Sequence, residues 1–408
     1  MSRPERFHAL DSWRGICATL VAAGHLTVMS HQYYIPFFSN YYLWVDFFFV
    51  LSGFVITHAY GTRLSACADV GRFVVRRFGR LWPLHATMLA AFLALELAKL
   101  LLVHFGHMRV DHPPFSGEYS LGSILPNLTL TQALGFYPIE TWNRPSWSIS
   151  VEFYTYLLFA ALGLLIGTQG RGRARMLWLV SAIFIAATAA LILANVAPSL
   201  STTATFGIFR CLYGFFVGHI VYVLFRRFPL NSSLAIWFEL LVLAGVAAFV
   251  ALAGRTPLGL GAPIIFGAAT WVFAHEDGGV SRLLSRPLFT FFGERSYSIY
   301  MVHSFVAILS VSVFHQLAAH TAVAHWAALK PSPGRPELPL ITFSNLYAGD
   351  LACLAYLAVV VLLSVLTYKF VEKPGRAIFN MLSRSMFPDT SAPVPTSTED
   401  TVSAVTSK

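Results

Sequence analysis

Three ionisable side chains interrupt an apolar stretch close to the N-terminus. Asp11 and Arg14 stand at its beginning and His25 stands deep inside it. Arg14 and His25 are eleven residues apart, close to a whole number of helical turns, so both side chains point the same way, about 16 Å apart along the axis. An ionisable residue inside a membrane is by default a candidate for function. The alternative is a histidine that only bonds a neighbouring helix.

Two carboxylates are expected at a similar depth. Asp46 lies near the predicted outer end of an apolar run in WVDFFFVLSGFVI, and Glu152 does so in PSWSISVEFYTY. A carboxylate bonded to one imidazole nitrogen fixes the tautomer and raises the basicity of the other nitrogen. His25 would then be a general base, with either Asp46 or Glu152 as its partner. The alternative is a buried polar network that only holds three helices together.

A cluster of arginines precedes the third apolar run. In VGRFVVRRFGRLWP, Arg72, Arg76 and Arg80 recur every four residues on one helical face, with Arg77 beside them. Arginine offers paired donors suited to phosphate. Cytosolic arginines next to a membrane span are also ordinary topology signals, and that interpretation stays open.

The elements that must position these residues are membrane helices. The chain has 408 residues, of which 56% are hydrophobic and 12% charged, and its mean hydropathy is +0.64. This composition excludes a soluble globule and predicts an all-α polytopic integral membrane protein. Runs long enough to span a bilayer number about ten, at 13–30, 42–60, 82–105, 147–167, 176–195, 206–225, 234–253, 258–275, 296–317 and 349–368.

The distribution of positive charge predicts the orientation. With both termini in the cytosol, the outer segments hold few of the 28 lysines and arginines, namely Arg109, Arg144, Arg255, Lys330 and Arg335. This asymmetry satisfies the positive-inside rule. The net charge of +9 therefore reflects topology, and we expect no nucleic-acid partner. The four scattered cysteines indicate neither a disulfide framework nor a metal site.

The chain is predicted to form one membrane domain, residues 1–376, followed by a cytosolic tail, residues 377–408. Beyond about residue 388 the tail has the composition of disorder. Outer segments 106–146 and 318–348 are long enough to shape a site. The second is rich in proline, which predicts a stiff irregular cover.

Six segments resemble motifs of the membrane acyltransferase-3 family and occur in the same order. They are LDSWRGICATLVAAGH, VDFFFVLSGFVI, RRFGRLWP, WSISVEFYTY, FGERSYSIYMVH and YKFVEKP, which together span about residues 7–376. The resemblance implies a ten-helix bacterial inner-membrane O-acyltransferase. Its donor would be cytosolic acyl-CoA, usually acetyl-CoA, and its acceptor a hydroxyl of a surface or exported polysaccharide or related glycan. No metal cofactor is implied.

The resemblance also assigns residues. The family's Arg-ten residues-His element matches Arg14 and His25, its Arg-x-x-Arg element matches Arg77 and Arg80, and its acidic residue in the Trp-Ser motif matches Glu152.

In the mechanism that we predict, Arg76, Arg77 and Arg80 bind the CoA phosphates, and Asp11 and His303 are further candidate binding residues. The acceptor enters past Asp46 and Glu152, and Arg14 belongs to the catalytic group. His25 removes the hydroxyl proton or is itself acylated first.

Two other functions fit part of the sequence. A transporter or flippase of a glycan or lipid-linked intermediate would also place ionisable residues at mid-bilayer. However, the chain shows no internal repeat and no pair of broken helices. A non-catalytic acyl-CoA sensor would explain the inner arginines but not the outer carboxylates.

Overall fold

The computed structural model describes residues 6–106, 113–166, 205–254, 256–320, 327–332 and 335–388, with isolated positions between 180 and 203. Most of the predicted fifth span, residues 171–175 before it and the tail beyond 388 lie outside these residues. The described elements are almost all helical. The helices are α1 His8–His25, α2 Pro36–Ser39, α3 Trp44–Tyr60, α4 Cys67–His104, α5 Ile124–Leu128, α6 Trp147–Ile166, α8 Gly207–Arg227, α9 Ala235–Ala253, α10 Ala262–Phe273, α11 Gly279–Leu284, α12 Pro287–His320, α13 Leu346–Thr367 and α14 Lys373–Met386.

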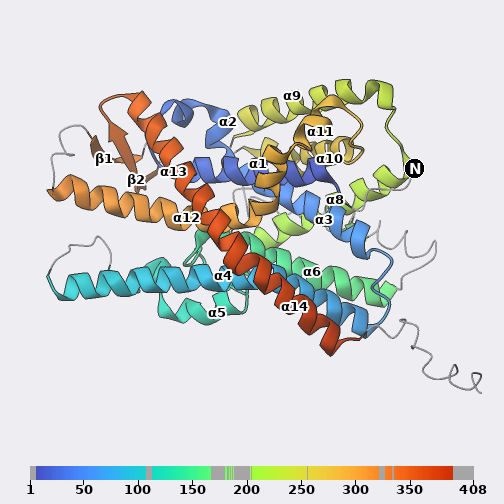
Figure 1. Cartoon of the computed structure of the whole chain (residues 1–408), viewed down its shortest axis with the longest axis horizontal. Helices are drawn as coiled ribbons and strands as arrows, with labels where there is room; N and C mark the ends of the chain where they lie inside the picture. Colours follow the sequence, from blue (N-terminus) through green and yellow to red (C-terminus); the bar gives the residue numbers. More distant parts are fainter. Residues whose placement is uncertain are drawn as a thin grey trace, which may run out of the picture.

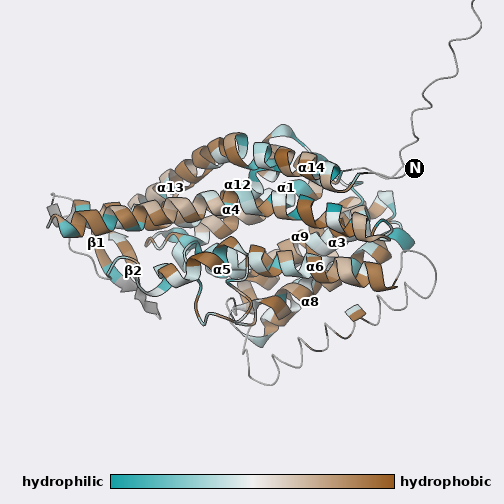
Figure 2. Ribbon diagram, turned by 90° about the horizontal axis from the view of Figure 1, so that it is seen from below, coloured by the Kyte–Doolittle hydropathy of each residue, from teal (hydrophilic) through white to brown (hydrophobic). Residues whose placement is uncertain are grey.

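The fold is that of an all-α polytopic membrane protein, as the composition predicts. Within the described residues, seven helices are long and apolar enough to cross a membrane, namely α3, α4, α6, α8, α9, α12 and α13. Hydrophobic residues dominate these helices along most of their length (Figure 2). Two other predicted spans are α1, whose 18 residues include Asp11 and Arg14, and α10, which has only 12 residues.

The long helices run side by side (Figure 1). Helices α4 and α12 lie roughly parallel, and α13 with α14 crosses them obliquely. The start of α1 and the end of α14 lie at one end of the molecule. We call this the arginine-rich end, because Arg72, Arg76, Arg77 and Arg80 all lie near the start of α4.

The opposite end carries a small β-hairpin. Strands β1 Ala327–Ser332 and β2 Arg335–Phe343 pair antiparallel, with Ala327 opposite Phe343 and Pro331 opposite Pro339. The prediction of an irregular cover over residues 318–348 is therefore wrong for this part. A two-stranded sheet consists only of edge strands, where proline is tolerated.

Helix α1 is held at the centre of the molecule by α12. Gly15 and Gly293 lie at their crossing, where a Cβ on Gly15 would come within 2.5 Å of the Gly293 nitrogen. Small residues of this kind allow membrane helices to approach closely. The start of α1 is tied down by Glu276, whose Oε1 accepts a hydrogen bond of 2.7 Å from the Ala9 amide. Partial burial raises the pKa of Glu276.

Candidate active site

A cavity of about 530 Å³ lies between α1, α3, α4, α6 and α12. It extends from the arginine-rich end, where Arg6 and Arg376 line it, to Ser148 near the beginning of α6. Its charged lining consists of five arginines and three carboxylates, namely Arg6, Arg14, Arg77, Arg80, Arg376, Asp11, Glu152 and Glu294. A cavity with this excess of cations is suited to an anionic ligand.

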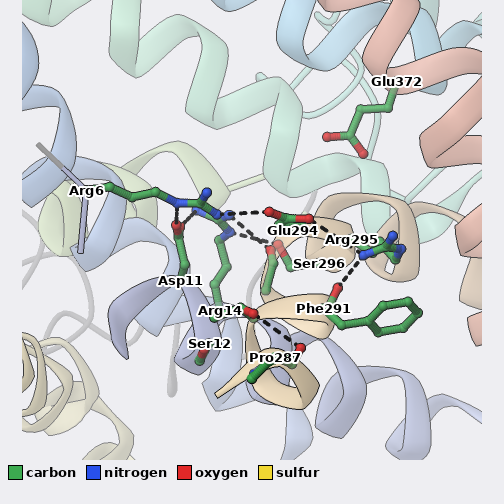
Figure 3. A network of polar contacts seen from close by, with 12 residues as sticks. Arg6, Asp11, Ser12, Arg14, Pro287, Phe291, Glu294, Arg295, Ser296 and Glu372 are labelled. Atoms are coloured by element: carbon green, nitrogen blue, oxygen red, sulfur yellow. Dashed lines mark hydrogen bonds and ion pairs between the residues drawn. The ribbon is translucent and has the colours of Figure 1, made fainter. Parts of the chain in front are cut away.

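Arg14 and Asp11 line this cavity next to Glu294 and Ser296 of α12. Figure 3 shows the contacts between them. Arg14 is 3.0 Å from Asp11 through Nη1, and its Nε donates to the Ser296 hydroxyl at 2.7 Å. Its Nη2 donates to the Gly293 carbonyl at 3.1 Å. Arg6 donates to the other Asp11 oxygen at 2.7 Å, and this hydrogen bond raises the pKa of Arg6. Arg14 is therefore fixed in one orientation between α1 and α12.

Arg77 and Arg80 also line the cavity, but unlike Arg14 they are not held by hydrogen bonds to any residue that the structure describes. Within the described part of the chain, neither guanidinium makes a hydrogen bond or a close ion pair with a carboxylate. Arg77 instead lies over aromatic rings, with its Cζ 5.1 Å from the centre of Tyr60 and 5.6 Å from that of Tyr156. The donors of both arginines thus remain available to a ligand in the cavity.

The structure corrects the predicted arginine face. Arg76 turns away from the cavity, and its Nε donates to the Ser383 hydroxyl on α14 at 3.0 Å. Arg72 pairs with Asp69 at 2.6 Å. Because α14 packs along this side of α4, Arg76 serves the contact between these two helices, and Arg72 pairs within α4. Arg77 and Arg80, three residues apart, are the ones that reach the cavity.

Glu152 belongs to the same cavity as these arginines. Its Oε1 accepts a hydrogen bond of 2.6 Å from the Tyr156 hydroxyl, which in turn accepts one of 2.7 Å from Ser52. The sequence prediction placed Glu152 on the path of the acceptor. The structure instead places it in the wall that faces Arg77 and Arg80. Tyr156, which sequence reasoning missed, lies one helical turn from Glu152 on the same face.

Asp46 has a different partner from the one predicted. Its two carboxylate oxygens accept hydrogen bonds from Nε and Nη2 of Arg210 on α8, at 2.9 and 2.8 Å. Both side chains are almost completely buried, with exposed fractions of 0% and 1%. Asp46 does not line the cavity. A carboxylate whose two oxygens bind one guanidinium neutralises that buried charge, so the structure assigns Asp46 to the α3–α8 contact.

This assignment gives a testable prediction for Asp46. Asp46→Asn should reduce the folded fraction, because removing one partner leaves the Arg210 charge buried and unpaired. Asp46→Asn combined with Arg210→Gln should recover it. Size-exclusion profiles and activity per folded molecule would measure both effects, and we expect that activity to stay within about tenfold of the wild type, in contrast to the loss of a general base. A fully folded Asp46→Asn protein with a loss of more than a hundredfold would restore the catalytic role.

His25 and His303 contact each other outside the cavity, and neither of them lines it. Their ring centres are 4.6 Å apart, and the ring of Tyr41 is also 4.6 Å from His25. Nδ1 of His25 donates to the Val21 carbonyl at 2.8 Å, which leaves Nε2 as the basic nitrogen. A backbone carbonyl therefore occupies the position where the sequence predicted a carboxylate.

His303 is connected to the cavity through Tyr300. His303 is fully buried, and within the described residues neither of its ring nitrogens has a well-formed hydrogen bond. The ring of Tyr300 is 5.6 Å from that of His303, and Tyr300 lines the cavity. Its hydroxyl contacts Ser148 at 2.9 Å. Tyr300 and His303 therefore lie between the cavity and His25.

Comparisons with known proteins identify the family. The sequence profile of the acyltransferase-3 family, described as an acyltransferase domain, matches residues 7–369. The chain belongs to this family. It is therefore an acyltransferase and a multi-pass membrane protein, which argues against the transporter and sensor alternatives.

Two curated proteins are similar to parts of the chain. Protein 2 in the picA locus of Rhizobium radiobacter is 33% identical over 172 residues, which is 40% of this chain and 85% of that protein. The acyltransferase MdmB of Streptomyces mycarofaciens is 33% identical over 119 residues, or 28% of this chain and 26% of MdmB. No solved structure shows significant similarity to the chain.

Proposed function

We propose that this acyltransferase moves an acyl group, most simply acetyl, from acyl-CoA to a hydroxyl of a surface or exported glycan. The observation that carries the proposal is the pair Arg77 and Arg80, whose donors face the cavity without a described carboxylate partner. Phosphate is an anion that arginine donors bind well. In this proposal the CoA phosphates bind at the arginine-rich end, and the pantetheine arm runs along the cavity toward Tyr300.

The orientation of the reaction follows from the charge distribution. The arginine-rich end faces the cytosol by the positive-inside rule, and acyl-CoA is a cytosolic metabolite. The acceptor then approaches from the end that carries the β-hairpin. We propose the bacterial cytoplasmic membrane as the location, because there an internal donor can serve an exported glycan.

His25 supplies the chemistry in this proposal. Its Nε2 takes the proton as the acceptor oxygen attacks the thioester carbonyl. The carbon–sulfur bond breaks, and the CoA thiolate leaves with that proton. In the alternative route, Nε2 attacks the thioester carbonyl and expels the CoA thiolate, which gives an acyl-imidazole. The acceptor oxygen then attacks the acyl carbon and displaces the imidazole of His25, and the proton lost by the hydroxyl neutralises the thiolate. Both routes require the acyl carbon to pass Tyr300 and reach the two imidazole rings.

The experiment is to incubate the purified protein with radiolabelled acetyl-CoA and measure CoA thiol release, with and without surface polysaccharide from cells that lack the gene. Label should transfer to the polysaccharide as a base-labile ester. Mass spectrometry of polysaccharide from cells with and without the gene provides the cellular test. The proposal is refuted if the protein releases no CoA and the ester content of the polysaccharide is the same with and without the gene.

A further inference from the structure

Glu372 is a buried carboxylate that the proposed reaction does not yet use. It is part of YKFVEKP and is the last residue of a π-helical turn, Tyr368–Glu372, between α13 and α14. Single π turns within α-helices often occur at functional sites. Only 2% of Glu372 is exposed. In Figure 3 its side chain extends from its helix toward the cluster around Arg14 and Glu294.

The carboxylate faces the arginines without binding them closely. Its Oε2 accepts a hydrogen bond of 2.8 Å from the Ser298 hydroxyl on α12. Its Oε1 lies 3.5 Å from Nη1 of Arg376, which is long for a charged pair. Arg14 and Arg80 interact with Glu372 only through space.

In this position Glu372 compensates the positive charge of the cavity without forming close hydrogen bonds to Arg80. Arg14, Arg80 and Arg376 all line the cavity, and buried cations require compensation. A carboxylate in close contact with Arg80 would provide it but would also occupy the donors that a phosphate needs. Because Ser298 holds Glu372 away from Arg80, the charge of Glu372 compensates these arginines and the donors of Arg80 remain available. A bound phosphate would then be attracted by the arginines and repelled by Glu372.

We propose that Glu372 is the resident counter-charge of these arginines and that Ser298 positions it, so that the site binds the phosphates of CoA and can still release CoA after transfer. The inference rests on the proposed function, because it takes the ligand to be CoA. Glu372 and Ser298 are positioning residues, since they act through the arginines.

The test is equilibrium binding of free CoA to the purified protein. Glu372→Gln should tighten CoA binding by about tenfold, because it removes a like charge that repels the phosphates at an effective dielectric constant near 20. Ser298→Ala should weaken binding severalfold, because the freed carboxylate can move onto the arginine donors. Glu372→Asp keeps the charge and should stay close to the wild type. Pantetheine, which lacks the phosphates, should bind Glu372→Gln and the wild type equally.

The opposite signs separate this role from a purely structural one, which would weaken binding in both variants. Glu372→Gln binding CoA no tighter than the wild type would overturn the inference while leaving the proposed function intact. If the Gln variant does not fold, Ser298→Ala decides, and unchanged or tighter CoA binding by that variant would overturn it. A wild-type protein that binds no CoA would refute the proposed function itself, and this inference with it.

Discussion

Replacing His25 with glutamine is expected to abolish acyl transfer while leaving CoA binding nearly unchanged. Glutamine keeps a hydrogen-bonding side chain of similar size, but it cannot take a proton at neutral pH. Nδ1 of His25 is already committed to the Val21 carbonyl, so Nε2 is the nitrogen that can act as a base. Loss of a general base alone lowers the rate by about 10²–10⁴, and loss of a covalent step would lower it further.

Binding should be spared because His25 is far from the arginines. It is the last residue of α1, whereas Arg14 lies eleven residues earlier in the same helix. The measurements are steady-state transfer to polysaccharide and equilibrium CoA binding by the same preparation. Near-normal turnover by His25→Gln would make the histidine a packing residue.

His85 provides the matched control. It is a buried histidine of α4 whose Nε2 contacts the Asn127 carbonyl at 2.9 Å, a contact that a glutamine amide can reproduce. His85→Gln should therefore retain transfer.

Rapid quenching of the wild type followed by mass spectrometry would distinguish the two routes, since only the covalent one accumulates an acyl group on His25.

The helices were largely predictable because a bilayer demands long apolar runs. Helices α3, α6 and α8 begin and end within a few residues of the predicted spans. Helix α4 begins well before its predicted span, at Cys67, because its first turns pack on α14 instead of lying in the hydrocarbon. Hydropathy alone does not assign that extension to a span, since four arginines interrupt its apolar residues.

The pairing of Asp46 with Arg210 was not predictable from the pattern. The two residues are 164 positions apart, and the sequence shows each as a single charge within an apolar helix. Depth alone placed Asp46 near His25, but lateral position in a helix bundle depends on which helices are neighbours. In this fold α3 packs extensively against α8, and that contact determines the partner of Asp46.

The arginine cluster shows the same limit on a smaller scale. Residues 72–80 of α4 make more than two turns, so arginines at 72, 76, 77 and 80 cover more than one face. The spacing alone does not reveal which face meets the cavity. The packing of α14 determines this, because α14 covers the face of α4 that carries Arg76, whose Nε donates to the Ser383 hydroxyl. The role that we propose for Glu372 likewise depends on the turn of helix that brings it back toward α12.

Arg80→Ala is expected to raise the KM for acyl-CoA by roughly ten- to a hundredfold, with a smaller effect on kcat. The guanidinium of Arg80 lines the cavity, and losing one hydrogen bond to a charged group costs about 1.5–3 kcal/mol. The effect should fall mainly on binding, because the CoA phosphates stay bound to the protein throughout the transfer. Initial rates over a range of acetyl-CoA concentrations would measure both constants.

Arg76→Ala is the matched control for this prediction. Arg76 lies on the same helix and carries the same charge, but its side chain contacts Ser383 outside the cavity. Both variants remove one positive charge from the arginine-rich end, so an effect on membrane insertion should appear equally in both. Only a role in donor binding makes Arg80→Ala the worse enzyme at low acyl-CoA. Equal KM values in the two variants, with reduced amounts of both in the membrane, would make these arginines topology signals and remove the main support for the donor site.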